Sequence, residues 1–380
     1  MKLLHLADVH LGVKAVGFGD RADDLRRRIQ AAFERALSVA GERACDVVLI
    51  AGDLFDSNRV GDRTLHAATK ALADFLAAAP QAHVLLIPGN HDCLGDGSIY
   101  HAAEFTRLGE RFHLFTEPAG ETVRLDNPDA AIHAVPFMCN FKQLDINPLA
   151  ALSPLPEAKH NIAMVHVGVT APHWDAQDAP QVTCEEIAAC GMDYVALGHF
   201  HNFTLEKTGS VVARYPGPPE VIGLGEAAGG AIVVELTEAG VATELVRVSS
   251  LELKQLQIMA AELDSEGALA DKLLEHAGAN VVLRAEIAGV LPLGVRLETD
   301  EVAEELSDRF YRLSLDDASA YGAVELDEGD YPERLVTGKF MRMMQERIEA
   351  ARASGDERGA RIGAEALNLG VHLLQGGDLQ

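Results

Sequence analysis

The chain has 380 residues, of which 48% are hydrophobic and 24% charged, and its formal net charge is −26. This composition is typical of a globular protein of two or three domains and excludes a largely disordered chain. A surface this acidic repels nucleic acid, so any contact with DNA requires a local basic patch or bound cations. The sequence has no run of about 18 apolar residues, and polar residues interrupt its short apolar start, so we expect a cytoplasmic protein without a membrane span or signal peptide.

The cysteines give no sign of a disulfide framework. They are odd in number and scattered, at Cys45, Cys93, Cys139, Cys184 and Cys190. Cys184 and Cys190 are too far apart in sequence for the close pairing of a structural zinc site. We therefore expect all five cysteines to be reduced and mostly buried.

The first 90 residues predict strands and helices in alternation. Apolar runs in KLLHLADVH, DVVLIAGDLFD and HVLLIPGNHD predict three buried strands, the second of them over residues 47–51. Residues 23–40 and 62–79 carry apolar side chains at helical spacing. Arg26, Arg27 and Arg28 lie on the polar face of the first helix, as either a local positive patch or a solvated helix face. Alternating strands and helices predict a largely parallel sheet covered on both faces.

The pattern changes after residue 110. RFHLFTEPAGETVRL and AAIHAVPF predict strands joined by turns, and HNIAMVHVGV predicts another buried strand. A short helix then precedes a strand over residues 194–197. VVARYPGP and GGAIVVELTEAGVATELVRV predict strands that close a second sheet. The expected fold class is an α/β sandwich of two sheets with helices outside.

Beyond the sandwich, expected at residues 1–249, we expect two further parts. The segments from LKQLQIMAAE to YRLSLDDA predict strand, helix, strand, helix, strand, which indicates a small α/β accessory domain at residues 250–330. Residues 331–380 predict a helical segment that ends in a helix over residues 360–374. Its apolar stripes FMRMMQERI and EALNLGVHLL either pack on their own core or bind a partner, and the sequence favours neither alternative.

Polar side chains directly follow the predicted buried strands of the first domain. Asp8 and His10 end the first strand, Asp53 the second, Asn90 and His91 the third, His166 the fourth, and His199 and His201 the fifth. Sites in open α/β sheets lie outside the carboxyl ends of the strands. We therefore expect these five segments to bring carboxylate, amide and imidazole groups to one edge.

These side chains suit a pair of divalent cations. Carboxylate, imidazole and amide oxygen are ligands for Mn²⁺, Fe²⁺ or Zn²⁺, and eight candidates are too many for one ion. Two ions about 3.5–4 Å apart that share a carboxylate would use seven ligands and leave one histidine free. Such a pair clamps a phosphate and activates the attacking water, while the free histidine protonates the leaving group or stabilises charge. Each motif alone is typical of a turn, but their order after buried strands favours the metal site.

The motifs resemble a known family. The series Asp8-Val-His10, Gly52-Asp53, Gly89-Asn90-His91-Asp92, His166 and Gly198-His199-Phe200-His201 resembles the signature of the calcineurin-like metallophosphoesterases. LLHLADVHLG, AGDLFD and ARYPGPPEVIGLGE are most similar to the DNA-repair exonuclease branch, of the SbcD and YhaO type. The motifs cover residues 1 to about 225. The resemblance implies two mixed sheets flanked by helices, and a phosphodiester hydrolase with two metal ions, usually Mn²⁺, with Fe²⁺, Zn²⁺ or Mg²⁺ as alternatives.

The resemblance also implies residue roles. One ion would be held by Asp8, His10, Asp53 and His201, and the other by Asp53, Asn90, His166 and His199, with Asp53 bridging the two. His91 would face the scissile phosphate without binding metal, and Asp92 would orient His91 through a hydrogen bond. Asn58 and Arg59, close to the second motif, are candidates for substrate binding.

The implied partners are DNA, an SMC-like ATPase of the SbcC type and a second copy of the chain. The sequence departs from the pattern of this branch in one respect that opposes DNA binding. Residues 250–330 occupy the position of the branch's DNA-capping domain, but they are strongly acidic, as in LDDASAYGAVELDEGD. A second hypothesis is therefore a phosphodiesterase or phosphatase for small molecules. A third is an inactive scaffold for the ATPase, against which the presence of every metal position argues.

Overall fold

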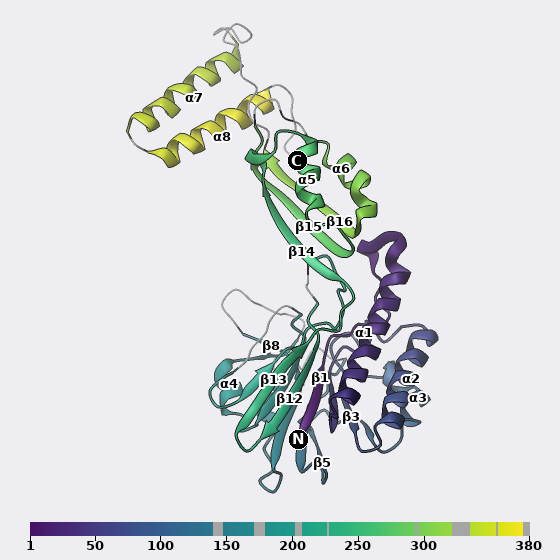
Figure 1. Ribbon diagram of the computed structural model, residues 1–380. Helices are drawn as coiled ribbons and strands as arrows, with labels where there is room; N and C mark the ends of the chain where they lie inside the picture. Colours follow the sequence, from purple (N-terminus) through teal and green to yellow (C-terminus); the bar gives the residue numbers. More distant parts are fainter. Residues whose placement is uncertain are drawn as a thin grey trace. The chain divides into compact units, whose positions relative to one another are not determined.

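The computed structural model describes residues 1–139, 147–170, 179–201, 207–225, 228–292, 295, 297–320, 335–354 and 356–374. The chain divides into two compact units, Met1–Glu252 and Leu253–Gln380, whose elements are labelled in Figure 1. No helix in these described ranges is long and apolar enough to cross a membrane.

The first unit contains a six-stranded sheet with the strand order β13-β12-β1-β2-β3-β4. Its parallel strands are β1 (Lys2–Leu6), β2 (Val47–Ala51), β3 (His83–Ile87) and β4 (Phe112–Leu114). β12 (Ala231–Thr237) and β13 (Gly240–Val246) form an antiparallel hairpin beside β1. The prediction that this hairpin closes the second sheet is wrong, because apolar periodicity indicates burial but not which strand a segment pairs with.

A five-stranded sheet packs against the first, with the order β11-β10-β7-β6-β5. Its strands are β5 (Glu121–Leu125), β6 (Ala130–Ala134), β7 (His160–His166), β10 (Tyr194–Gly198) and β11 (Val212–Arg214). β5 and β6 are antiparallel and the other neighbours are parallel. Fully buried Leu49 from the first sheet and Met164 from the second belong to one apolar cluster. The prediction of two mixed sheets flanked by helices is confirmed.

Helices lie on the outer faces. α1 (Ala22–Glu42) packs against α2 (Asp62–Ala78), and α2 packs against β3 (Figure 1). α4 (Cys184–Ala189) contributes Ile187 to a cluster on the second sheet. The shorter elements of this unit are η1 (Val16–Arg21), η2 (Ile99–His101), α3 (Ala103–Thr106), η4 (Pro148–Ala151), β8 (Gly168–Val169) and β9 (Gln181–Val182).

The three arginines of α1 are engaged with carboxylates. Arg26 pairs with Asp23, and Arg27 and Arg28 both pair with Asp24. Arg26 also donates to the main-chain oxygen of Val13. Because each positive charge has a carboxylate partner, this face supports the solvated-helix alternative rather than a positive patch.

The second unit has the element order that the sequence predicts. It runs β14 (Glu252–Met259), η5 (Ala260–Glu262), α5 (Glu266–Leu274), β15 (Gly278–Val290), α6 (Thr299–Leu306), η6 (Ser307–Arg309) and β16 (Phe310–Ala320), with the sheet order β14-β15-β16. Leu283 and Ile287 of β15 and Leu269 of α5 belong to its apolar core. Most of the acidic stretch LDDASAYGAVELDEGD lies outside the described residues.

Two helices end the described chain. α7 (Val336–Ala353) packs against α8 (Glu357–Leu374). Met341, Met344 and Ile348 of α7 are buried, whereas Met343 of α7 is 51% exposed and Ile362 of α8 is 52% exposed. Part of the predicted apolar stripe therefore packs within the segment, and part remains at the surface.

Candidate metal centre

The carboxyl ends of β1, β2, β3, β7 and β10 bring the predicted ligands together. Three groups of possible ligand atoms occur among the described residues, and within each group the atoms lie within 4.8 Å of one another. The groups are Asp8, His10 and His201; Asp8, Asp53 and His166; and His10, Asp56 and His91. Asp8, His10, Asp53 and His166 are buried. The site therefore joins the edges of both sheets, since β1, β2 and β3 belong to the first sheet and β7 and β10 to the second.

Asp53 occupies the middle of this arrangement. Its Oδ2 lies 3.4 Å from His166 Nε2 and 3.8 Å from His10 Nε2. Its Oδ1 accepts a hydrogen bond of 2.9 Å from the main-chain N–H of His91. One carboxylate thus faces the imidazole of His10 and the imidazole of His166, which are predicted to hold different ions.

His166 is oriented as metal-ligating histidines usually are. Its Nδ1 donates to the main-chain oxygen of Ala51 at 2.9 Å, which leaves Nε2 as the ring nitrogen that faces the centre. That Nε2 lies 2.8 Å from the amide oxygen of Asn90. In this orientation of the amide, the oxygen of Asn90 and the Nε2 lone pair of a neutral His166 face the same point, as two ligands of one cation do.

A second such contact lies on the side of Asp8. The Nε2 atoms of His10 and His201 are 3.2 Å apart, although only one of two facing ring nitrogens can donate. Asp8 Oδ1 accepts from the main-chain N–H of His199 at 2.9 Å. The ring of His199 lies beside that of His166, with 5.4 Å between ring centres. The carboxylate and amide oxygen atoms and the imidazole nitrogen atoms gathered here are the ligand types of a divalent-cation site.

The backbone is held in an unusual conformation at this edge. Among the described residues, φ is positive at six non-glycine positions, four of which are predicted ligands: Asp8 (55°), His10 (52°), Asp53 (53°) and His199 (109°). Each costs about 1–2 kcal/mol in an L-residue. A Cβ atom at Gly52 would collide with the His166 ring, and one at Gly89 with the Asp53 carboxylate. Such strain is typical of functional sites and is maintained by the surrounding packing.

The electrostatics favour positive charge at the centre. Burial opposes a charged imidazole at His166, but the Asp53 carboxylate raises the pKa of His166 to about 9. Burial also opposes the ionised form of Asp53, yet His166 and His10 lower the pKa of Asp53 below its usual range. The pKa of His10 is raised by Asp56, Asp53 and Asp8 despite burial. Protons and divalent cations compete for such sites.

The matched family model agrees with this geometry. The model described as calcineurin-like phosphoesterase matches residues 1–203, more than half of the chain and a range that includes every predicted ligand. The chain belongs to the calcineurin-like phosphoesterase family. It is therefore a metal-dependent phosphoester hydrolase.

This phosphoesterase is similar to several curated proteins. It is 27% identical over 229 residues to the DNA double-strand break repair protein Mre11 of Methanopyrus kandleri, covering 58% of this chain and 49% of that protein. It is 29% identical over 231 residues to Mre11 of Aeropyrum pernix, covering 57% and 53%. It is 24% identical over 307 residues to the uncharacterized metallophosphoesterase YhaO of Bacillus subtilis, covering 77% and 72%. The chain spans about half the length of these Mre11 relatives.

His91 of the phosphoesterase is exposed beside the ligands. Its ring centre is 4.6 Å from that of His10. Its Nδ1 donates to the main-chain oxygen of Asp56 at 3.0 Å. The prediction that Asp92 orients His91 by a hydrogen bond is wrong. The buried carboxylate of Asp92 instead accepts from the main-chain N–H groups of Gly89 and Phe55 and from the hydroxyl of Tyr100.

Asp92 therefore shapes the loop that carries Asn90 and His91. Burial, and then the charge of Asp53, raise the pKa of Asp92 to about 6. Its contact with Tyr100 could not be predicted from the spacing of the motif, because Tyr100 lies in the separate short helix η2. Asp56 is the last residue of AGDLFD. The motif did not indicate which residue the carboxylate of Asp56 contacts.

The two predicted substrate-binding residues lie outside the ligand cluster. Asn58 Nδ2 donates to the main-chain oxygen of Cys93, and its Oδ1 accepts from the main-chain N–H of Ile99, each at 2.9 Å. Asn58 therefore braces the loop after His91, a role that its position in the sequence did not suggest. Arg59 is exposed at the surface.

A disulfide joins Cys93 to Cys139, so the prediction that all five cysteines are reduced is wrong. Leu94 pairs with the segment after β6, donating to Phe137 O at 2.8 Å and accepting from Cys139 N at 2.9 Å. This pairing places the two sulfur atoms together although 46 positions separate them in the sequence. Cys45, Cys184 and Cys190 are free thiols.

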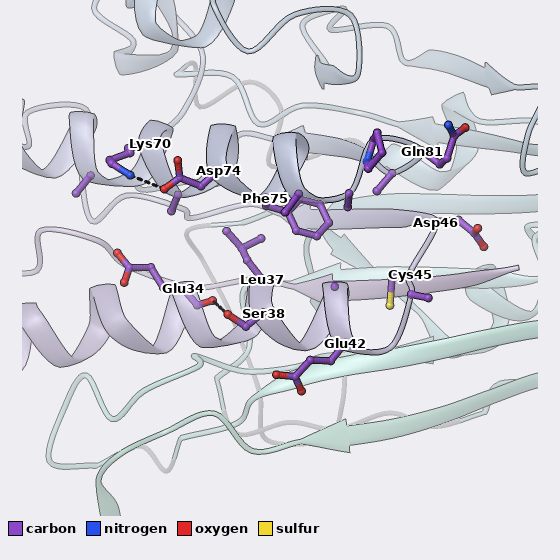
Figure 2. Close-up of a pocket in the computed structure, with 18 residues that line it drawn as sticks. Glu34, Leu37, Ser38, Glu42, Cys45, Asp46, Lys70, Asp74, Phe75 and Gln81 are labelled. Carbon is purple, nitrogen blue, oxygen red and sulfur yellow. Dashed lines mark hydrogen bonds and ion pairs between the residues drawn. The ribbon is translucent and has the colours of Figure 1, made fainter.

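A cavity of about 980 Å³ lies away from the metal centre, between α1 and α2 (Figure 2). Cys45 and Asp46, which precede β2, and Gln81 and Ala82, which precede β3, contribute to its lining. It therefore lies toward the beginning of these strands, whereas the candidate ligands follow their carboxyl ends. None of the predicted ligands lines it.

Proposed function

We propose that this phosphoesterase is a nuclease that hydrolyses phosphodiester bonds of DNA with two divalent metal ions, preferably Mn²⁺. The observation that carries the proposal is the convergence of carboxylate, amide and imidazole groups from five chain segments around Asp8 and Asp53. The similarity to Mre11 proteins, which are named for DNA double-strand break repair, favours DNA among phosphodiesters. A cytoplasmic location, a homodimer and an SMC-like ATPase partner belong to the same proposal.

The residues divide into ligands and one general acid. Asp8, His10, Asp53 and His201 would hold one ion, and Asp53, Asn90, His166 and His199 the other. When bound, two ions supply an activated nucleophile and neutralise charge on the phosphoryl oxygens. His91 donates from Nδ1 to Asp56, so Nε2 is left to hold a proton for the leaving oxygen. Its exposure gives substrate access to that nitrogen.

The net charge of −26 is the main physical objection to a DNA substrate. Lys14 and Arg59 are exposed in the segments that follow β1 and β2, and Arg63 is exposed in the first turn of α2. Bound cations add positive charge at the metal centre, which reduces the repulsion of phosphate. DNA binding of this kind weakens steeply as salt is raised.

The test compares three substrates with the purified chain: linear duplex DNA, single-stranded DNA and bis-p-nitrophenyl phosphate, each with Mn²⁺ or a chelator. We expect Mn²⁺-dependent cleavage of DNA that declines with added salt. His91→Ala should lower the rate about 100-fold or more with Mn²⁺ binding unchanged. The control His101→Ala changes an exposed histidine of η2 and should keep the wild-type rate.

The charge also favours a second candidate, a phosphodiesterase for small molecules. Hydrolysis of bis-p-nitrophenyl phosphate that is insensitive to salt, with no cleavage of either DNA, would replace the nuclease proposal with this one. Full activity of His91→Ala on all three substrates would contradict the role assigned to His91.

A further inference from the structure

Asp56 lies beside the metal centre, and none of the roles above uses its carboxylate. It follows Asp53 by three positions in AGDLFD, and its side chain is 20% exposed. Its main-chain N–H donates to the oxygen of Leu11 at 3.0 Å. That hydrogen bond fixes the segment after β2 against the segment after β1, so the position of Asp56 relative to His10 is set by the fold.

The carboxylate faces the outer nitrogen of a predicted ligand. Asp56 Oδ1 lies 3.4 Å from His10 Nδ1. This Nδ1 is buried and has no hydrogen-bond partner within normal geometry in the described part of the chain, so Asp56 is the group placed to receive its hydrogen. His10 Nε2, the other nitrogen, faces Asp53 and His201. A carboxylate on one nitrogen of a histidine directs the lone pair of the other toward a metal ion.

The main-chain carbonyl group of Asp56 contacts His91, the second histidine with a proposed role. Its carbonyl oxygen lies 3.0 Å from His91 Nδ1. A carbonyl can only accept, so Nδ1 carries the hydrogen and Nε2 is left for the substrate. The rings of His10 and His91 are perpendicular, with an interplanar angle of 89°. One residue therefore contacts both rings on the Nδ1 side.

We propose that Asp56 is a positioning residue that sets which nitrogen His10 offers to metal and which nitrogen His91 offers to substrate. The inference deepens the proposed function and rests on it for the roles of the two histidines. Asp56, His10 and His91 also lie close enough together to hold an ion. The geometry nevertheless assigns Asp56 to orientation, because its carboxylate meets His10 on the Nδ1 side, whereas Nε2 faces the remaining ligands.

The experiment measures Mn²⁺ binding by calorimetry in wild type, Asp56→Ala and Asp56→Asn. Asp56→Ala should bind the same number of ions about 10–100-fold more weakly, which is the usual effect of removing a group that orients a ligand. Asp56→Asn should lose less, because its amide oxygen still accepts from His10 Nδ1. The control Asp96→Ala removes an exposed carboxylate and should bind as wild type does.

Two further measurements separate positioning from a folding defect. In chelator, Asp56→Ala should still unfold in a single cooperative transition, since its main-chain contacts remain. Its loss of bis-p-nitrophenyl phosphate hydrolysis should be partly restored by excess Mn²⁺, which a misfolded protein would not show. If Asp56→Ala proves unstable, Asp56→Asn takes its place, with a loss of Mn²⁺ affinity that is smaller but still measurable, and wild-type affinity in Asp56→Asn would then overturn the inference.

Wild-type affinity in Asp56→Ala would overturn the inference, and so would the loss of one whole ion, which would make Asp56 a ligand. Calorimetry uses no DNA. A wild-type protein that binds Mn²⁺ but cleaves no DNA would therefore end the nuclease proposal and leave the result for Asp56 intact.

Discussion

The Oδ2 atom of Asp53 lies 3.4 Å from Nε2 of His166, although the two residues end strands of different sheets. Asp53 follows β2 of the six-stranded sheet, and His166 ends β7 of the five-stranded sheet. The contact exists only because the sheets pack face to face with these strand ends at a common edge. Metal binding and the packing of the sandwich are therefore linked at this position.

Asp53→Asn should abolish tight metal binding without unfolding the protein. The substitution removes the negative charge between His10 and His166 but keeps an oxygen that can accept from the main-chain N–H of His91. We expect Mn²⁺ affinity to fall by more than the roughly 100-fold typical of residues that only orient a ligand. Calorimetry with Mn²⁺ measures this directly. Asp74→Asn, an exposed change on α2, is the control, and wild-type affinity in Asp53→Asn would contradict the bridging role.

Reduction of the disulfide should destabilise the protein. The bond between Cys93 and Cys139 closes a loop with a sequence separation of 46, and removing such a crosslink costs about 2–4 kcal/mol of unfolding free energy. Guanidinium titrations with and without dithiothreitol measure the difference. The variant Cys93→Ser/Cys139→Ser should be insensitive to the reductant. Because it retains the three free cysteines, equal sensitivity in variant and wild type would show that the effect has another source.

His5 should make stability depend on pH. It is buried, its Nδ1 contacts the hydroxyl of Tyr194 at 2.9 Å, and burial lowers its pKa from 6.5 to about 3. Between these values the unfolded chain binds a proton at this position and the folded protein does not, so stability falls as pH is lowered. The contribution is about 2 kcal/mol between pH 6.5 and 5.

The variant His5→Gln tests this, because an amide can still bond to Tyr194 but does not titrate. Its unfolding free energy should fall less steeply between pH 6.5 and 5 than that of wild type. His101→Gln, at an exposed position, should keep the wild-type slope. An unchanged slope in His5→Gln would show that His5 contributes nothing to the acid sensitivity.

Glu220 should be one of the most costly polar residues to remove. It is fully buried, and its carboxylate accepts from the main-chain N–H groups of Val221, Ser250 and Leu251 and from two serine hydroxyls. Glu220→Ala leaves these donors unsatisfied, so we expect a loss of about 3–5 kcal/mol in urea titrations.

The matched control is Glu244→Ala, because Glu244 is exposed and pairs only with Arg43 among the described contacts. Its loss should cost less than about 1 kcal/mol. Similar losses in the two variants would contradict the account of Glu220. A smaller loss in Glu220→Gln than in Glu220→Ala is expected, because the amide keeps one accepting oxygen.

The amino-acid sequence by itself determined where helices and strands form and which polar side chains follow the buried strands. The strand over residues 47–51 is found as predicted, and the helix predicted over residues 23–40 extends from Ala22 to Glu42. Such predictions succeed because burial and helical periodicity are local properties of the chain. The polar residues after each buried strand also indicated one shared edge, since parallel strands end on the same side of a sheet.

Only the tertiary structure decided which groups meet. It placed the β12–β13 hairpin beside β1, directed Asp92 to Tyr100 and away from His91, and joined Cys93 to Cys139. It also set the carboxylate of Asp56 against His10. The separation of two residues along the chain does not give their distance in space, because strand pairing and the packing of the loops at this edge decide which segments meet.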